Sequence, residues 1–465
     1  MGPLDAKALL QEYDVVQFGD ARVDQRLGRI VSQLATSPSE SFPEQMATDA
    51  DQEALYRFLG NRKVTIDTLL EGHRTRTLQR IREYALVRIV HDTSQFCFEG
   101  DREGLGTLQA KEKGFLAHFA LAVRADETRE PLGVLGVRPF INTHQQRGLT
   151  KSQKAALNRA TPREEKKSSR WEKLALDVAG ALPSNVEAIH LMDQEADDFS
   201  IFAALTHARV RFIIRVEARR LTAESVRTDV FLSQNPAQIF RQVAVSRRSS
   251  AQASPQHPAR AERVAALSVR SSTITLRRPA SSADAPLAEL SVQAVHVFEA
   301  SPPTGETPID WMLFTSEPIK TMQDLEAIVD HYRARWVIEE YFKALKTGCA
   351  FEKRQLCSFE SLVRALGLFV PIAWTLLALR TLGRDRSDRC ATFVFDLEQL
   401  RLLRALLEKR GRRLAEKPTI RDAMLGIAGL GGHIKNNGDP GWHVLGRGMR
   451  RFVEAEEVWE AVREM

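Results

Sequence analysis

The sequence predicts an α/β protein in which a central region of strands and helices carries a β-rich insertion and lies between helical segments. Three observations lead to this prediction. Short apolar runs typical of strands alternate with helical stretches between residues 86 and 216. Alternating polar and apolar segments follow up to residue 321. Residues 1–78 and the chain beyond 322 carry apolar side chains at helical spacing.

The composition is that of a folded protein. The chain has 465 residues, of which 43% are hydrophobic and 27% charged, and this length suggests about three domains. Its four cysteines form no C-x-x-C pair, which argues against a disulfide scaffold and a cysteine zinc site. The apolar run 365–378 contains Pro371 and is short for a bilayer span, so we expect a buried helix. With acidic residues near its start, the chain is expected to be soluble and cytoplasmic, with no membrane partner.

The charge distribution leaves two interpretations open. The formal net charge is +6 and the pI about 9.2, and lysine and arginine gather at 151–173 and 333–354. Such clusters suit a polyanion, with nucleic acid as the first candidate. They are equally compatible with an ordinary solvated surface.

The N-terminal residues 1–78 are expected to form a helical domain. Apolar side chains recur at helical spacing in 22–34 and 51–59. Arg22 and Arg26 lie on the first of these helices and would either contact DNA or face solvent.

The central residues 79–372 predict a mixed sheet with helices. Strands are expected at 86–92, 116–123, 132–141, 186–193 and 211–216, and helices at 164–182 and 196–205. Three strands followed by helix, strand, helix and strand form an α/β layer pattern. The same order occurs in ribonuclease-H-like cores, so we expect such a core here.

The insertion and the tail complete the predicted organisation. Residues 218–321 are expected to form the β-rich insertion, with strands near 268–276, 288–298 and 310–315 and a loop at 247–260. Residues 373–465 are expected to form a helical C-terminal domain, with helices at 393–407 and 452–462. These helices would pack either internally or against a second subunit.

Two aspartates stand at the predicted ends of apolar strands. Asp92 follows LVRIVH, and Asp193 follows VEAIHLM. Side chains at strand ends face the usual ligand crevice of an open α/β sheet. Two carboxylates there would repel each other unless cations lie between them, and oxygen ligands favour magnesium or manganese. Taken singly, each aspartate would more often cap a turn.

A third carboxylate lies on the predicted helix 330–348. At about 100° per residue, one arc of roughly 80° carries an aromatic hydroxyl, an acid and three cations. These residues are Tyr332, Arg335, Glu339, Lys343 and Lys346. An adjoining apolar arc of Ile338, Phe342 and Leu345 would pack on the sheet. The arrangement fits a metal-binding carboxylate beside phosphate-binding cations, or alternatively a solvated helix with a Glu339–Lys343 pair.

The spacing Y-(2)-R-(3)-E-(6)-K formed by Tyr332, Arg335, Glu339 and Lys346 resembles the signature of the IS-four family of bacterial insertion-sequence transposases. Four residue types at fixed spacing rarely coincide by chance. Further stretches are similar to segments of that family. They are Gly19-Asp20 with Arg22 and Arg26, Ala54 to Asn61, Asp92 to Ser94, Glu165-Lys166 with Ser168 and Trp171, Asp193 to Asp197, and Trp311 to Pro318.

The resemblance implies a ribonuclease-H-like catalytic core in which Asp92, Asp193 and Glu339 bind two Mg²⁺ ions, with Mn²⁺ able to substitute. It implies an N-terminal DNA-binding domain and a C-terminal domain used for homodimerisation. The implied reaction is cut-and-paste transposition with a hairpin intermediate, acting on double-stranded DNA at transposon ends and on target DNA.

The same resemblance assigns roles to cationic and aromatic residues. Tyr332, Arg335, Lys343 and Lys346 would hold phosphates near the scissile bond. Trp311 would stack on an unstacked base, although it could equally be a core tryptophan. Arg215 would contact DNA.

Departures and alternatives remain. Gln194 stands where the family usually has arginine, and 247–260 has no obvious counterpart. One alternative is a catalytically silent DNA-binding regulator of a transposase. A second is a ribonuclease-H-fold nuclease without strand transfer. A zinc hydrolase is disfavoured because no H-E-x-x-H motif is present.

Overall fold

The computed structural model describes residues 6–108, 112–141, 168–245, 258–385, 388–434 and 438–463, with a few residues between 150 and 161. The chain forms two compact units. Unit 1 comprises Met1–Arg147, Ala181–Glu187 and Trp336–Met465, and unit 2 comprises Gly148–Gly180 and Ala188–Arg335. The domain limits expected at 78 and 372 stay a prediction.

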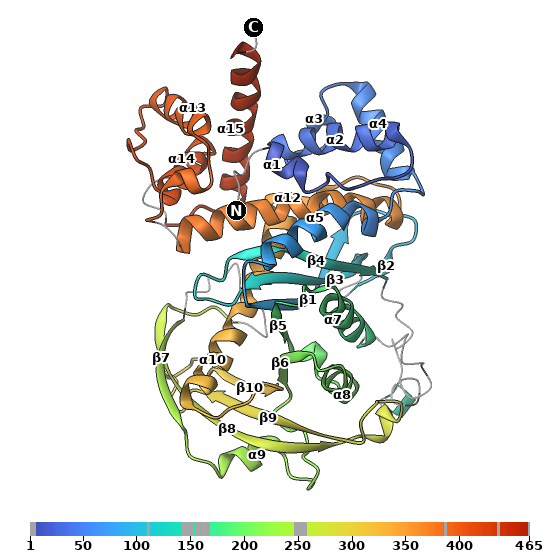
Figure 1. The fold of residues 1–465 in the computed structure, drawn as a ribbon, viewed down its shortest axis with the longest axis vertical. Coiled ribbons are helices and arrows are strands. Elements are labelled where there is room, and N and C mark those ends of the chain that lie inside the picture. Colours follow the sequence, from blue (N-terminus) through green and yellow to red (C-terminus); the bar gives the residue numbers. More distant parts are fainter. Residues whose placement is uncertain are drawn as a thin grey trace. The chain divides into compact units, whose positions relative to one another are not determined.

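The N-terminal part of unit 1 is helical. Its helices are α1 (Ala6–Gln11), α2 (Ala21–Thr36), α3 (Phe42–Gln45), α4 (Asp49–Gly60) and α5 (Ile66–Ile81) (Figure 1). Side-chain caps start several of them, as where Asp20 accepts a hydrogen bond from the Arg22 N–H at the start of α2. The buried side chains of α2 are those that its periodicity indicated, so the helices predicted at 22–34 and 51–59 are confirmed.

An antiparallel sheet forms the centre of unit 1. It contains β1 (Leu86–Phe98), β2 (Gly106–Thr107), β3 (Lys113–Arg124) and β4 (Pro131–Phe140). Strand β3 pairs with the other three. Helices α5 and α12 (Phe359–Asp385) pack against β4 and against each other.

The apolar run 365–378, which we expect to form a buried helix and which is short for a bilayer span, lies within α12. The longer segment Phe359–Arg384 is long and apolar enough to cross a membrane by length and composition, with a mean hydropathy of 2.0. However, 83% of its most apolar window is buried inside the protein, as expected for a core helix. Trp374 of this helix donates a hydrogen bond to the Pro131 carbonyl of β4 at 2.9 Å.

The remaining elements of unit 1 follow Trp336. They are α11 (Val337–Lys343), the π-helical turn η7 (Ala344–Gly348), the short turn η8 (Phe351–Lys353), α12, the short turn η9 (Ala391–Phe393), α13 (Leu397–Glu408), α14 (Ile420–Leu430) and α15 (Trp442–Arg463). Helices α13, α14 and α15 pack on one another. The C-terminal part of α15 extends away from α13 and α14 (Figure 1).

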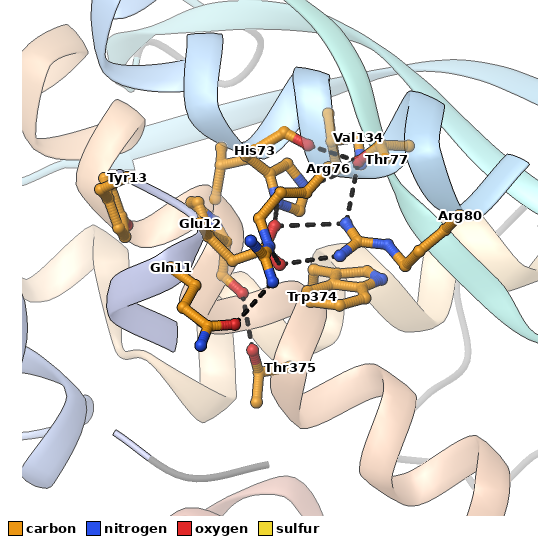
Figure 2. Close-up of polar contacts among 12 residues, drawn as sticks. Gln11, Glu12, Tyr13, His73, Arg76, Thr77, Arg80, Val134, Trp374 and Thr375 are labelled. Atoms are coloured by element: carbon orange, nitrogen blue, oxygen red, sulfur yellow. Dashed lines mark hydrogen bonds and ion pairs between the residues drawn. The ribbon is translucent and has the colours of Figure 1, made fainter. Parts of the chain in front are cut away.

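A buried carboxylate fastens the start of the chain to the sheet of unit 1. Glu12 accepts two hydrogen bonds from Arg80 on α5, at 2.7 and 3.2 Å. The Nδ1 atom of His73 lies 2.5 Å from the same carboxylate, while Nε2 of His73 accepts the Val134 N–H at 2.9 Å (Figure 2). Gly133 makes the close approach of α5 and β4 possible, because a Cβ there would lie 2.0 Å from the Thr77 hydroxyl.

Unit 2 contains further helices and strands of the mixed sheet. Its helices are α7 (Ser169–Ala181), α8 (Phe199–His207), α9 (Thr228–Ser233) and α10 (Met322–Arg333), with short turns η3 (Gln194–Ala196), η5 (Ala280–Ser282) and η6 (Ala334–Trp336). Its strands are β5 (Glu187–Met192), β6 (Arg211–Val216), β7 (Ile239–Val245), β8 (Arg263–Arg277), β9 (Glu289–Phe298) and β10 (Asp310–Thr315). The protein is thus of the mixed α/β class.

The sheet has ten strands, and those of unit 2 follow the order β5-β6-β10-β9-β8-β7. Strands β5 and β6 are parallel, and the other neighbours are antiparallel. One face buries a core shared with α7, α8 and α9, in which Trp171, Phe202 and Phe314 take part. The predicted residues Glu165 and Lys166, most of the loop 247–260 and the start of the helix at 164–182 lie outside the described residues.

Two expectations about local structure are wrong. Asp92 does not end its strand, because the alternating sequence TSQFCF continues β1 as far as Phe98. The helix at 330–348 is not uniform either, since α10, η6, α11 and η7 follow one another there. The buried residues of this segment are Tyr332, Ala334, Arg335, Ile338, Tyr341, Ala344, Leu345 and Gly348.

Candidate active site

Asp193 begins the group of predicted site residues in unit 2. It directly follows β5, and its carboxylate accepts the Glu195 N–H at 2.8 Å at the start of the turn η3. Strand β5 runs parallel to β6 with Met192 beside Ile214, so Asp193 comes next to Arg215 on the neighbouring strand. The expectation that Asp193 ends a strand is confirmed.

Arginines surround this carboxylate. Burial raises the pKa of Asp193, and the positive charges of Arg335 and Arg215 act against that rise. Arg335 is buried and also hydrogen-bonds to Tyr332, whose pKa burial raises to about 12. The Tyr332 hydroxyl therefore keeps its proton at neutral pH, and its oxygen accepts the hydrogen bond from Arg335, because a guanidinium can only donate.

Trp311 joins the same group. Its ring lies 5.8 Å from that of Tyr332 in an edge-to-face arrangement. Within the sheet, Leu313 of β10 pairs with Arg215 of β6, and Trp311 shares the face of Leu313 because side chains alternate along a strand. Trp311 is half-buried, so it is neither sealed in the core nor fully exposed.

Asp92 and Glu339 lie on neighbouring elements of unit 1. Asp92 faces Phe119 across the β1–β3 pair, and residues directly opposite each other share a face of the sheet. Helix α11 packs against β1, and its Phe342 ring lies 5.3 Å from that of Phe119. The helix carrying Glu339 therefore covers the sheet face that carries Asp92, and both carboxylates are half-buried. The predicted packing of Phe342 on the sheet is confirmed.

The two lysines of α11 and η7 have acidic partners in unit 1. The Lys343 amino group lies 2.7 Å from the Glu340 carboxylate, and Arg380 of α12 lies 2.5 Å from the same carboxylate. Lys343 thus has an acidic partner three residues before it on the helix.

Lys346 lies on the face of β1 that carries Asp92. Its amino group is 5.3 Å from the centre of the Phe96 ring, which shares that face with Asp92, and 3.6 Å from Glu352. Sequence reasoning missed Glu352 as the partner of Lys346 and Arg380 as a second partner of Glu340. No local spacing could have revealed Arg380, because it lies on a different helix.

The N-terminal arginines lie on α2 in unit 1. The Arg22 side chain is 88% exposed, with its Nε 3.4 Å from Asp20, and Arg26 is half-buried. Arg22 is thus available to a partner in solution. Of the predicted site residues, the structure brings Asp193, Arg215, Trp311, Tyr332 and Arg335 together in unit 2, and Asp92, Glu339 and Lys346 together in unit 1.

The donor atoms present suit a hard cation. Asp92, Asp193 and Glu339 all offer carboxylate oxygens, which magnesium and manganese prefer. Within the described ranges, no three His, Cys, Asp or Glu side chains are grouped so as to hold a metal ion.

Comparison with known proteins gives two family matches. Residues 5–64 match the family described as "Transposase DNA-binding", and residues 141–374 match the family described as "Transposase DDE domain". The second match covers half of the chain. Among solved structures, the chain is similar to the piggyBac transposase in its synaptic complex with hairpin DNA. That similarity has a TM-score of 0.35 and 8% identity, and covers 99% of this chain and 84% of the other.

Proposed function

Because the chain belongs to the DDE transposase family, we propose that it cuts and joins DNA in cut-and-paste transposition. The observation that carries the proposal is the surrounding of Asp193 by Arg215, Arg335 and Tyr332. A carboxylate beside one buried and one half-buried arginine suits a metal ion together with a phosphate, since the arginines balance the charge of the phosphate. DNA is the partner that the N-terminal family match supports.

Members of this family generally use divalent metal ions. We propose that Asp92, Asp193 and Glu339 together hold two Mg²⁺ ions, which Mn²⁺ can replace. Two bound cations supply charge stabilisation for the attacking and leaving oxygens of a phosphoryl transfer.

The cationic residues would hold the DNA backbone. Arg335 and Arg215 would contact phosphate oxygens beside Asp193, since a guanidinium can donate two parallel hydrogen bonds. The protonated Tyr332 hydroxyl would donate to the same group. Lys346 would contribute a point charge near Asp92, while Lys343 would first have to exchange Glu340 for a phosphate.

Trp311 would bind an unstacked base at the distorted DNA end. Its edge packs on Tyr332 and leaves part of the ring accessible, so an unstacked base could stack on it. The steps proposed from the sequence resemblance are nicking, hairpin formation, hairpin resolution and strand transfer, within a ribonuclease-H-like core. The resemblance is to the IS-four family and, within it, to the Tn-five transposase. We therefore propose that this protein acts on DNA in the bacterial cytoplasm.

A homodimer is proposed from the end of α15. Val458, Trp459 and Val462 are 65%, 39% and 65% exposed and follow one another around one side of the helix. A second copy of the chain would cover these side chains, as the synaptic dimer implied by the resemblance requires.

The test is metal-dependent cleavage of DNA. Purified protein would be incubated with a linear duplex containing the DNA that flanks its reading frame, with Mg²⁺ or Mn²⁺. The Glu339→Gln protein would be the matched control, because it keeps the shape of the side chain and removes the charge. Discrete cuts at a terminal repeat with hairpin ends, lost in the variant, would support the proposal.

Other outcomes distinguish the alternatives. Specific binding without cleavage by the unaltered protein would favour a silent regulator. Cleavage that depends on branches or hybrids, without hairpins, would favour a nuclease. Cleavage by an Asp193→Ala protein at the unaltered rate would remove Asp193 from the metal site.

A further inference from the structure

A buried arginine that has only neutral acceptors lies in unit 1. Arg354 is 2% exposed. Its guanidinium donates to the Glu40 carbonyl, to the Gln45 side-chain oxygen at 3.2 Å, to the Pro38 carbonyl at 2.5 Å and to the Cys349 carbonyl at 2.6 Å. No ion pair to a carboxylate is found for it within the described ranges.

This arrangement is costly for stability alone. Burial lowers the pKa of Arg354 to about 10, which means that the surroundings disfavour the charge. The rings of Phe369 and Phe42 lie 4.5 and 5.1 Å from the guanidinium carbon and offset part of the cost. An apolar side chain of similar volume would avoid the burial of a charge, so stability gives little reason for an arginine at this position.

The acceptors of Arg354 belong to two different parts of unit 1. Pro38, Glu40 and Gln45 lie within residues 5–64, which match the DNA-binding family. Cys349 follows the turn η7, which continues the helix that carries Glu339. One guanidinium therefore joins the DNA-binding region to the end of the Glu339 helix.

The segment on the Glu339 side is irregular. The Cys349 N–H donates to the Ala344 carbonyl at 2.8 Å and closes a π-helical turn. Ala350 then adopts the left-handed conformation with φ of 47°, which costs a non-glycine residue energy. Such conformations persist only where surrounding contacts enforce them, and π-helical turns often occur at functional sites. The bond from Arg354 to Cys349 is one of the enforcing contacts.

A second contact holds the other side of this irregular segment. Glu352 accepts the Cys97 N–H of β1 at 2.9 Å, on the strand that carries Asp92. A movement of the loop at Pro38–Glu40 would therefore be transmitted through Arg354 to a segment that is already braced against β1.

We propose that Arg354 is a positioning residue that couples DNA binding by residues 5–64 to the placement of Glu339. This inference rests on the proposed function, because Glu339 matters as a site residue only in that reaction. Arg354 itself touches neither DNA nor the reacting atoms.

The experiment compares Arg354→Met with Arg364→Met. Arg364 of α12 is the matched control, because it donates to the Val64 and Leu59 carbonyls at 2.8 Å each and thus ties the same N-terminal region to a helix that does not carry Glu339. For each protein, the affinity for terminal-repeat DNA, the single-turnover cleavage rate at saturating DNA and the melting temperature are measured.

We expect Arg354→Met to bind DNA within about threefold of the unaltered protein, since the phosphate-contacting side chains are unchanged. Its cleavage rate at saturating DNA should fall by about tenfold or more, because displacement of a site residue by 1 Å can cost ~100-fold. Arg364→Met should keep its cleavage rate at saturating DNA. Equal losses in both variants, or a loss in affinity with no loss in rate, would overturn the proposal.

Hydrogen exchange tests the coupling without cleavage. DNA binding to the unaltered protein should slow amide exchange across residues 337–353, and Arg354→Met should bind DNA without this change. No change in the unaltered protein would refute the coupling. If the unaltered protein bound but never cut DNA, the proposed function would fail, while the exchange result would still decide the coupling.

A milder variant covers the case in which Arg354→Met does not fold. Arg354→Lys keeps the positive charge but replaces the planar guanidinium by a single ammonium nitrogen. The lysine therefore cannot donate to the Pro38 and Cys349 carbonyls in the same geometry. It should show the same loss of cleavage rate at saturating DNA with affinity retained, and an unaltered rate would count against the proposal.

Discussion

Two arginines hold the N-terminal helices of unit 1 in different ways: Arg80 is half-buried and Arg354 is buried. Arg80 lies 4.2 Å from the Trp374 ring and donates two hydrogen bonds to the Glu12 carboxylate (Figure 2). Arg354 lies 4.5 Å from the Phe369 ring and donates to backbone and amide oxygens. Arg80 is paired directly with an opposite charge. Arg354 hydrogen-bonds to neutral acceptors, and the negative charge of Glu40, which is paired with Arg450 at 2.8 Å, acts on it only from a distance.

The charge pair at Glu12 is completed by a histidine in one defined state. Because Nε2 of His73 accepts the Val134 N–H, the proton of the neutral ring is on Nδ1 and points to Glu12. Burial lowers the pKa of His73, which keeps the ring neutral. Around Glu12 each named polar group therefore has its complement, as a rigid anchor requires.

The comparison of Arg80 with Arg354 indicates two different roles for an arginine in unit 1, one in stability and one in linking two segments. A carboxylate between two partners fixes the start of the chain and stabilises the fold. The Arg354 guanidinium is bound by carbonyl oxygens of two segments, one at Pro38 and one at Cys349. A displacement of either segment would therefore displace the guanidinium, and this makes Arg354 suitable as a link between the two segments. Four variants and conditions test this comparison.

The largest effect is expected for Glu12→Gln. Breaking a buried pair by removal of one partner leaves Arg80 without its counter-charge, and we expect a loss of about 3–5 kcal/mol in the free energy of unfolding. Urea unfolding measures it. The double variant Glu12→Gln with Arg80→Met should lose less than the two single changes added together, and simple additivity would mean that the pair does not interact.

The second largest effect is expected at low pH, where the stabilising contribution of Glu12 to the free energy of unfolding should be lost. Burial alone would raise the pKa of Glu12, but His73 and Arg80 outweigh it and bring the pKa from 4.5 to about 2. A carboxyl whose folded pKa is lowered stabilises above its unfolded pKa and loses that contribution as pH falls, here between about 4.5 and 2. At about 1.4 kcal/mol per pKa unit, the contribution is about 3 kcal/mol.

The buried His73 acts in the same direction at higher pH. Its folded pKa is below 6.5, so the unfolded chain takes up the proton first and stability falls as pH drops below 6.5. The measurement is the difference in unfolding free energy between the unaltered protein and Glu12→Gln from pH 7 to pH 3. That difference should shrink below pH 4.5, and a constant difference would contradict the assignment.

Arg354→Met should cost less stability than Glu12→Gln. The change leaves carbonyl oxygens unsatisfied, at about 1–3 kcal/mol for a buried group, but it also removes a buried charge. The expected net loss is about 1–2 kcal/mol by urea unfolding, with no added dependence on pH below 5. A loss as large as that of Glu12→Gln would erase the distinction between the two arginines.

The smallest effect on stability is expected for Arg22→Ala. Its side chain is exposed and near Asp20, so the change in unfolding free energy should stay within about 0.5 kcal/mol. Affinity for DNA should fall, and the dependence of log affinity on log salt should weaken by about one unit if Arg22 contacts a phosphate. An unchanged salt dependence would place Arg22 away from the DNA.

Local features of the fold could be predicted from the sequence. The period of 3.6 in α2 indicated its buried side, and the apolar run VEAIHLM indicated that β5 ends just before Asp193. Predictions failed where local signals conflicted with packing. Asp92 lies within β1 because β1 continues to pair with β3 beyond it, and a 3-10 turn at Ala334–Trp336 interrupts the helix predicted at 330–348.

The sequence by itself indicated a DDE transposase, three candidate carboxylates and most helices and strands, because periodicity and motifs are spacings along the chain. Only the tertiary structure decided the partners: Arg80 for Glu12, Arg380 for Glu340, and the loop at Pro38 for Arg354. The last pair is separated by 316 residues, and the oxygen that Pro38 offers is a backbone carbonyl, which every residue possesses. No pattern of residue types specifies such a contact, so packing alone selects it.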